Sequence, residues 1–142
     1  MGDANRSAGA YGKGRMTAQR AVIAQAAADQ GCAFTVDDLA VAARHEDASI
    51  GVATVYRAVA ALEATGWLER VGERAGSALF ARCAAGDRHH HHLICTTCGR
   101  VEPAECPLDV DTSEESRSGF LITGHEVTLY GLCPDCAPAE QG

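Results

Sequence analysis

The sequence predicts an α+β protein built from two lobes. Its first 82 residues contain three stretches with helical signals followed by two short strand-like runs, whereas the remainder is rich in extended segments and cysteines. Charge divides the chain at the same place, because residues 1–82 carry nine basic and nine acidic side chains, while residues 83–142 carry three and ten. A chain with two such characters is expected to have two lobes with different tasks.

Helical signals begin after a glycine-rich start. Residues 1–14 are small and polar, and we expect a flexible arm there. Thr17 is expected to cap a helix that ends near Asp29, and Thr35 a second helix with acids in its first turn. A third helix is predicted by a stripe of apolar residues three and four positions apart, Val52, Val55, Val59 and Leu62. Gly66 is expected to end it.

Strand signals follow the three helices. The runs WLERV and ALFARC around GERAGS predict a β-hairpin. Three helices and a hairpin in this order predict a winged helix-turn-helix over residues 15–83, with a hinge at 84–88. In residues 89–142 the segments HHHHLIC, GRVE and FLITGHEVTLYGLC predict strands or a hairpin, and PLDVDTSEESRSG a short polar helix. This small α/β lobe cannot rely on its apolar core alone.

Composition excludes several classes of protein. No run approaches 18 apolar residues, and the N-terminus has no apolar signal segment, so we expect a cytoplasmic protein without a membrane contact. The net charge of −7 argues against non-specific nucleic-acid binding by the whole chain. It leaves open DNA binding by the first lobe, where a few cations suffice.

Two C-x-x-C pairs predict a structural zinc site. Cys95 and Cys98 form one pair, and Cys133 and Cys136 the other. Four thiolates satisfy tetrahedral Zn²⁺ and leave no open position, so the ion adds folding energy to a lobe that needs it. The alternatives are a redox pair, which wants a βαβ setting that is missing here, or unpaired buried cysteines.

Four consecutive histidines form the second cluster. In a strand, His89 and His91 would face one side and His90 and His92 the other, so one tetrapeptide can serve two metal sites. The alternative is a solvated polar strand. Glu69, Cys83 and His125 are possible completing ligands, although singly Glu69 is expected to be a solvated charge and Cys83 a small buried hydrophobe.

A metal held by Glu69, Cys83, His90 and His92 would tie the two lobes together. A thiolate, two imidazoles and one carboxylate suit Zn²⁺ better than Fe²⁺ or Mn²⁺. Cys83 stands where charge and composition change along the chain. The group therefore predicts a metal site at the hinge between the two lobes.

Several polar residues of the first lobe suit DNA. Thr54, Tyr56 and Arg57 lie off the apolar stripe of the third helix, where they could contact bases or phosphates. Arg15 could reach a minor groove from the arm, and Arg20 could meet a phosphate. The alternative is an ordinary solvated helix face.

Together these residues resemble the ferric uptake regulator family, and within it the zinc uptake regulators. The resemblance covers about residues 14–137 and rests on IGVATVYRAV, HHHHLICTTCG and LYGLCPDC. It implies a winged helix joined by a hinge to a dimerisation domain, and a homodimer that binds palindromic double-stranded operators when its sensor is metallated. It also implies the hinge sensor ligands given above.

The resemblance implies a second sensor of His89, His91 and His125 with an acid. The family's usual interval back from His125 falls on Leu108, which is no ligand. The sequence departs from the family here, and several nearby residues can fill the position: Asp109, Asp111 or Glu105, or else Cys106.

The resulting prediction is a zinc-responsive transcriptional repressor, not an enzyme, with structural zinc and one or two regulatory zinc ions per chain and no small-molecule substrate. A regulator of the same family that responds to iron, manganese or nickel is the first alternative. A zinc buffer and a zinc hydrolase are more distant ones. The buffer leaves the Tyr56/Arg57 face unexplained, and the hydrolase needs an open coordination position that no motif supplies.

Overall fold

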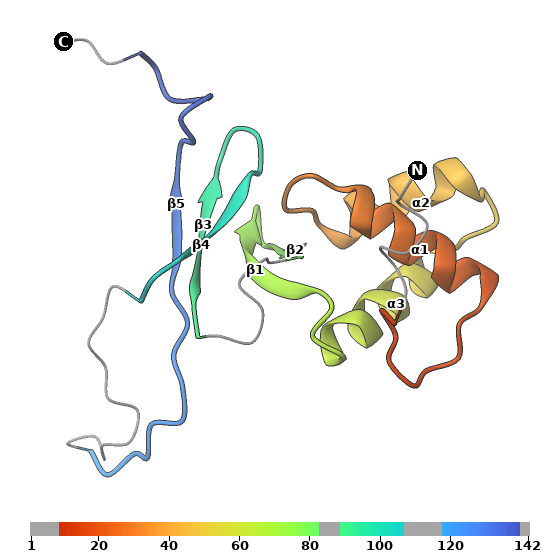
Figure 1. Cartoon of the computed structure of the whole chain (residues 1–142), viewed down its shortest axis with the longest axis horizontal. Coiled ribbons are helices and arrows are strands. Elements are labelled where there is room, and N and C mark those ends of the chain that lie inside the picture. Colours follow the sequence, from red (N-terminus) through yellow and green to blue (C-terminus); the bar gives the residue numbers. More distant parts are fainter. Residues whose placement is uncertain (1–8, 83–88, 107–117, 140–142) are drawn as a thin grey trace.

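The computed structural model describes residues 9–82, 89–106 and 118–139. A helical lobe with a β-hairpin lies beside a separate three-stranded sheet (Figure 1). No helix within these ranges is long and apolar enough to cross a membrane. The α+β architecture of two lobes is as predicted. The segment expected to hold a polar helix spans residues 107–119, and residues 107–117 lie outside the described residues.

Three helices form the first lobe: α1 (Ala18–Asp29), α2 (Val36–Glu46) and α3 (Val52–Ala64). The predicted caps are confirmed, because the hydroxyls of Thr17 and Thr35 accept the backbone N–H groups of Arg20 at 3.2 Å and Asp38 at 3.1 Å. Gly66 follows α3 with φ 77°, in the left-handed region that glycine adopts without steric cost. Local signals therefore determine where each helix begins and ends.

The helices bury one continuous core. Val55, Val59 and Leu62 of the predicted stripe are at most 3% exposed, whereas Val52 in the first turn of α3 is 40% exposed. Around them pack the largest buried side chains of the lobe, which are Ile23, Phe34, Leu39, Ile50 and Leu68. This core holds α3 rigidly, with its opposite face outward.

Residues 9–14 correct one expectation, since they are not a free arm. Ala10 and Tyr11 belong to the helical core, at 0% and 4% exposed. The Tyr11 hydroxyl donates to the carbonyl of Arg20 at 2.9 Å, and the Thr65 hydroxyl donates to the carbonyl of Ala10 at 2.7 Å. Polar composition suggested an arm, but one buried aromatic ring anchors the segment.

The hairpin of this lobe consists of β1 (Glu69–Arg74) and β2 (Ser77–Ala81), paired antiparallel. Its turn is shorter than the predicted GERAGS, because only Ala75 and Gly76 lie between the strands. Both have positive φ, 50° and 80°, which matches the twist of a two-residue hairpin turn. β1 therefore continues three residues beyond the predicted strand end.

The second lobe is a sheet in the order β4-β3-β5. Its strands are β3 (His91–Cys95), β4 (Val101–Ala104) and β5 (Thr128–Gly131). β3 pairs antiparallel with β4 and parallel with β5. The sequence left a strand or a hairpin open for FLITGHEVTLYGLC, and the structure shows one strand there.

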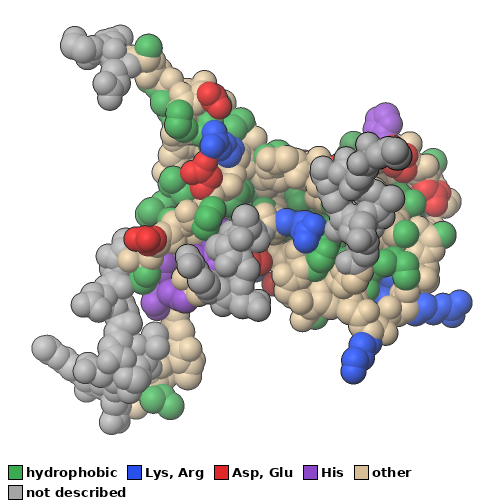
Figure 2. All heavy atoms as spheres, in the orientation of Figure 1, with side chains coloured by type: hydrophobic (Ala, Val, Ile, Leu, Met, Phe, Trp, Pro, Cys, Tyr) green, Lys and Arg blue, Asp and Glu red, His purple; other side chains and the backbone are tan. Residues whose placement is uncertain are grey.

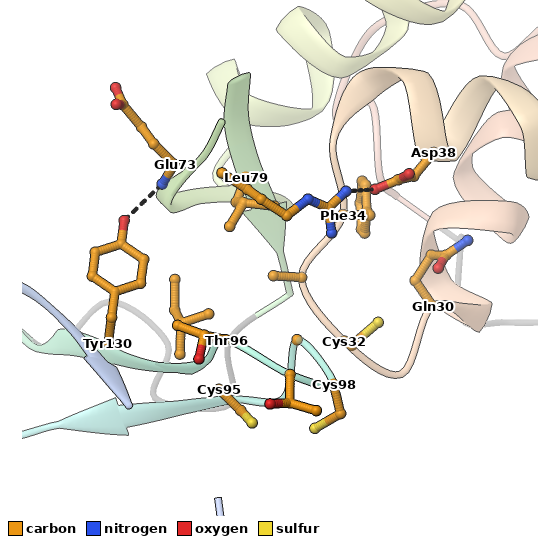
Figure 3. A pocket seen from close by; sticks show the side chains of 15 residues that line it. Gln30, Cys32, Phe34, Asp38, Glu73, Leu79, Cys95, Thr96, Cys98 and Tyr130 are labelled. Atoms are coloured by element: carbon orange, nitrogen blue, oxygen red, sulfur yellow. Dashed lines mark hydrogen bonds and ion pairs between the residues drawn. The ribbon is translucent and has the colours of Figure 1, made fainter. Parts of the chain in front are cut away.

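Contacts between β1 and the sheet join the lobes. The Tyr130 hydroxyl accepts the N–H of Glu73 at 2.8 Å, and the Thr128 hydroxyl donates to the carbonyl of Val71 at 2.9 Å. A pocket of about 370 Å³ lies beside this junction, between the loop before α2 and the β3–β4 turn (Figure 3). A small shared core of Ala33, Val71, Leu79, Ala81 and Ile94 supports the same junction.

Candidate metal centres

Four cysteines converge beyond the ends of β3 and β5. The Sγ atoms of Cys95, Cys98, Cys133 and Cys136 all lie within 4.8 Å of one another. Cys98 and Cys133 are 3.7 Å apart. A tetrahedral Zn²⁺ with Zn–S bonds of 2.3 Å requires Sγ···Sγ edges of about 3.8 Å. The residues predicted as the structural site are therefore brought together at a spacing that fits zinc.

Turns aim these sulfurs. Gly99 has φ 76°, and its N–H donates to the carbonyl of Cys95 at 2.9 Å, which closes the first knuckle. The N–H of Cys136 donates to the carbonyl of Cys133 at 3.0 Å in the second. The backbone N–H groups of Cys98 and Cys133 lower the pKa of Cys95 to about 6, whereas its contacts with Cys133 and Cys98 raise the pKa of Cys136 to about 12. Four thiolates cannot crowd together without a cation to neutralise them.

A second cluster joins the β1–β2 hairpin, the wing of the winged helix, to the sheet. Oε2 of Glu69, at the start of β1, lies 3.3 Å from Nε2 of His90 and 3.2 Å from Nε2 of His92. The side chains are 30%, 11% and 12% exposed, so the groups are largely withdrawn from water. Ala81 pairs with Glu69 across the hairpin, and Cys83 follows two residues later, outside the described residues. Three of the four predicted hinge ligands are thus in reach of one ion.

A third cluster lies on the other face of the histidine run. Nε2 of His125 is 3.3 Å from Nε2 of His89, 3.2 Å from Nε2 of His91 and 3.1 Å from Sγ of Cys106. His91 is 2% exposed. Its burial and, to a lesser extent, the neighbouring imidazoles lower its pKa, which favours the neutral ring. The alternation predicted for the four histidines is confirmed, with odd and even members facing separate clusters. Figure 2 shows most histidine side chains gathered on the sheet lobe.

None of the acids considered for this third cluster is placed in it by the described residues. Asp109 and Asp111 lie outside the described residues. Glu105 is exposed and is not among the cluster's four ligand groups. Cys106 occupies the place beside His125 instead. Among the described residues, the cluster therefore consists of three imidazoles and a thiol.

The residues suited to DNA do not share one environment. On α3, Tyr56 is 54% exposed, and the Arg57 guanidinium donates to the Thr54 hydroxyl at 3.3 Å, so the three form one outward face. Arg20 instead stacks its guanidinium over the Tyr11 ring at 4.9 Å and donates to the carbonyl of Arg15 at 3.1 Å. Arg20 thus also serves to anchor residues 9–14.

Sequence reasoning missed the contacts that hold the lobes against each other. The N–H of Ala33 donates to the carbonyl of Gly99 at 2.7 Å, linking the helical lobe to the cysteine knuckle. A Cβ on Gly72 would lie 2.7 Å from Ile94 Cδ1 and from the Tyr130 hydroxyl. The only available signal was Gly72 itself, because a glycine inside a strand often marks close approach of another segment.

Comparison with known proteins assigns the family. The model of the ferric uptake regulator family matches residues 12–130. The ferric uptake regulation protein of Bordetella parapertussis is 37% identical over 106 residues, covering 72% of this chain and 74% of that one. That of Legionella pneumophila is 37% identical over 89 residues, and the match spans 61% of this chain and 64% of its length.

Solved structures share the fold. A zinc-bound manganese uptake regulator is 30% identical, with a TM-score of 0.59, over 93% of this chain and 99% of that one. A zinc uptake regulator complexed with zinc and DNA is 23% identical, with a TM-score of 0.68, over 89% and 86%. The predicted architecture, a winged helix followed by a dimerisation domain, agrees with the fold of these structures. The chain belongs to the ferric uptake regulator family, a family of transcription regulators.

Proposed function

We propose that this protein is a metal-responsive transcriptional repressor of the cytoplasm, with zinc as its co-repressor and zinc uptake genes as its targets. Glu69 carries the proposal. Its carboxylate stands on the wing, yet lies within 3.3 Å of His90 and His92 on the sheet lobe. An ion bound by these groups touches both lobes, so its presence is linked to their relative orientation.

The same three residues account for the switch. A divalent cation would neutralise the Glu69 carboxylate and accept the imidazole lone pairs, and Cys83 would supply a fourth donor. Glu69, His90 and His92 then hold the wing against the sheet, whereas without the ion they lose that attraction. To change the populations from about 1:99 to 99:1, the competent orientation must gain about 5.5 kcal/mol.

The outward face of α3 is the proposed reader of DNA. Tyr56, Arg57 and Thr54 project from a helix whose other face is buried, so their positions are fixed by the core. In a dimer two such helices must reach major grooves about one helical turn apart or a multiple of it, which makes the lobe orientation decisive. The operator is accordingly a palindromic duplex. A zinc buffer would have no need of such a face, so the face favours a DNA-binding regulator over a buffer.

The donor atoms favour zinc as the signal. Imidazoles with the Cys83 thiolate suit Zn²⁺, while an oxygen-rich set would suit Mn²⁺ or Fe²⁺. The solved manganese uptake regulator that is 30% identical to this chain is zinc-bound, whereas the curated relatives are named for iron. The second candidate is therefore a regulator of the same family that responds to iron, manganese or nickel.

The sheet offers a surface for a second copy. Leu93 of β3 and Leu129 of β5 pair directly and are 42% and 43% exposed. Leu132, just beyond the end of β5, is also 50% exposed. Adjacent exposed apolar side chains on a sheet face indicate an interface, which supports a homodimer through this lobe.

Operator binding under controlled zinc tests the function. The zinc-loaded protein would first select its operator from random duplexes, and affinity would then be measured across a free-zinc titration. We expect zinc to tighten binding by roughly 5–150-fold, the usual range of coupling between sites. Glu69→Ala and Cys83→Ser should abolish the response, whereas Cys32→Ser, which removes a thiol outside all three clusters, should keep it.

Three results would contradict the proposed function. An operator affinity that ignores zinc in the wild type overturns zinc sensing. A response to Fe²⁺, Mn²⁺ or Ni²⁺ instead selects the second candidate. If no sequence is enriched with any metal bound, the protein is not a repressor, and a buffer or a chelator-sensitive hydrolase takes its place.

A further inference from the structure

The sheet lobe has ligand groups beyond both ends of its strands. At one end, Cys95 closes β3, Cys98 precedes β4 and Cys133 follows β5. The groups of the third cluster are placed at the opposite end. His91 opens β3 just after His89, Cys106 follows β4 and His125 precedes β5. Each of the three strands is therefore flanked by candidate ligands on both sides.

The geometry around His125 favours a cation. Its Nε2 has three neighbours at 3.1–3.3 Å, from Cys106, His91 and His89. A ring nitrogen can donate one hydrogen or accept one, so it cannot hydrogen-bond all three neighbours at once. Nδ1 of the same ring is buried and lacks a hydrogen-bond partner among the described residues. The four ligand atoms of the cluster therefore lie around a common point.

The separations suit a tetrahedral ion. Zn–N bonds of 2.0–2.1 Å imply nitrogen–nitrogen edges of about 3.3–3.4 Å. The nitrogen–nitrogen edges from His125 to His89 and His91 are 3.3 and 3.2 Å. All four ligand atoms, including the Cys106 sulfur, lie within 4.8 Å of one another. A four-coordinate site is complete without any further residue.

We propose that Cys106 is the fourth ligand of this cluster, making it a closed His₃Cys zinc site that clips the sheet at the end opposite the four cysteines. A thiolate takes the place where the family pattern puts an acid and this sequence has Leu108. Closure leaves no coordination position for water or substrate, so the site is not catalytic. It stands whether or not the hinge cluster switches operator binding.

A thiolate also sets the choice of metal. Softer ligands favour Zn²⁺ over the oxygen-preferring Mn²⁺ and Fe²⁺, an order that also follows the general affinity series. We expect loss of Cys106 to weaken zinc at this site by more than about 100-fold, since even indirect supporting residues cost 10–100-fold. The four-cysteine and hinge clusters should be unaffected.

Cobalt spectroscopy identifies the thiolate directly. The background is the full-length variant His90→Ala/His92→Ala, which removes the hinge cluster, with zinc kept on the four cysteines. Co²⁺ is then added, and a thiolate-to-cobalt charge-transfer band is expected in the near ultraviolet. Adding Cys106→Ser should eliminate this band. Adding Cys32→Ser, the matched control, should leave it intact.

A further variant separates ligation from folding. Cys106→Asp supplies a carboxylate, so we expect it to bind Co²⁺ tetrahedrally without the charge-transfer band. The proposal is overturned if the band persists in Cys106→Ser or never forms in the background protein. Cobalt binding that survives Cys106→Ser with unchanged affinity, but is lost in Asp109→Ala or Asp111→Ala, would assign the fourth position to that acid.

Discussion

At the scale of single residues, Gly72 is a point where the two lobes approach each other closely. Its missing side chain leaves room for the Ile94 methyl and the Tyr130 hydroxyl, and that hydroxyl accepts the N–H of Glu73. Residues far apart in sequence therefore meet at one position that tolerates no Cβ without movement. Hydrogen bonding and close packing both depend on it.

Gly72→Ala should accordingly destabilise the protein. The new Cβ would lie 2.7 Å from two side-chain atoms, and the Tyr130 hydroxyl must move from Glu73 to relieve the contact. We expect a loss of about 1–3 kcal/mol in the free energy of unfolding, the usual cost of overpacking. Gly131→Ala is the control, because nothing lies within 4 Å of its Cβ position. Equal denaturation midpoints for the two zinc-loaded variants would contradict the close approach.

At the scale of elements, the start of α2 is joined to the wing. The Asp38 carboxylate completes a capping box with Thr35 and pairs with Arg74 of β1 at 2.6 Å. Burial opposes ionisation of Asp38, but the Thr35 N–H and the Arg74 guanidinium outweigh it, so its pKa lies below the ordinary 3.8. A lowered carboxyl pKa contributes stability above the ordinary value and loses it as pH falls through the folded value.

Asp38→Asn tests this link between helix and hairpin. At pH 7 we expect it to unfold about 1 kcal/mol more easily than the wild type, as for the loss of a helix cap. The difference should shrink as the pH falls below about 3.8, where the wild-type carboxyl also loses its charge. Asp37→Asn removes the same charge from an exposed position in the same helical turn and serves as the control. Equal losses in both variants, or a difference that ignores pH, would refute the link.

Elements with local signals were predictable, and those set by tertiary contacts were not. Thr17, Thr35 and Gly66 specify helix ends through their own backbone and side-chain chemistry, and the alternating histidines follow from strand geometry. The extension of β1 depends on the conformations of Ala75 and Gly76, which composition alone did not reveal. The hydrogen bond from the Glu73 N–H to the Tyr130 hydroxyl has no signature in the sequence of either segment. The metal clusters were partly predictable. The C-x-x-C spacing identifies the four cysteine ligands from the sequence, whereas the position of Cys106 beside His125 is seen only in the folded structure.

At the scale of the whole molecule, the two lobes differ in what holds them together. The helical lobe has a large apolar core formed by its three helices and Tyr11. In the sheet lobe, among the residues described, only His91, Ile94 and Cys95 are buried. So small a core needs metal ligation for its stability. Loss of metal should therefore affect one lobe much more than the other.

Trp67 allows this asymmetry to be measured, because it is the chain's single tryptophan. It packs against the helical core, and the Arg82 guanidinium lies 4.1 Å from its ring, so its fluorescence reports on the helical lobe. In Cys98→Ser, or after chelation strong enough to strip the four cysteines, we expect rapid amide exchange in β3, β4 and β5 with little change in Trp67 emission. Cys32→Ser should retain slow exchange in the sheet. Simultaneous loss of the Trp67 signal would mean that the lobes unfold as one unit, and that the contacts of Gly72 and Ala33 couple them more strongly than the separate cores do.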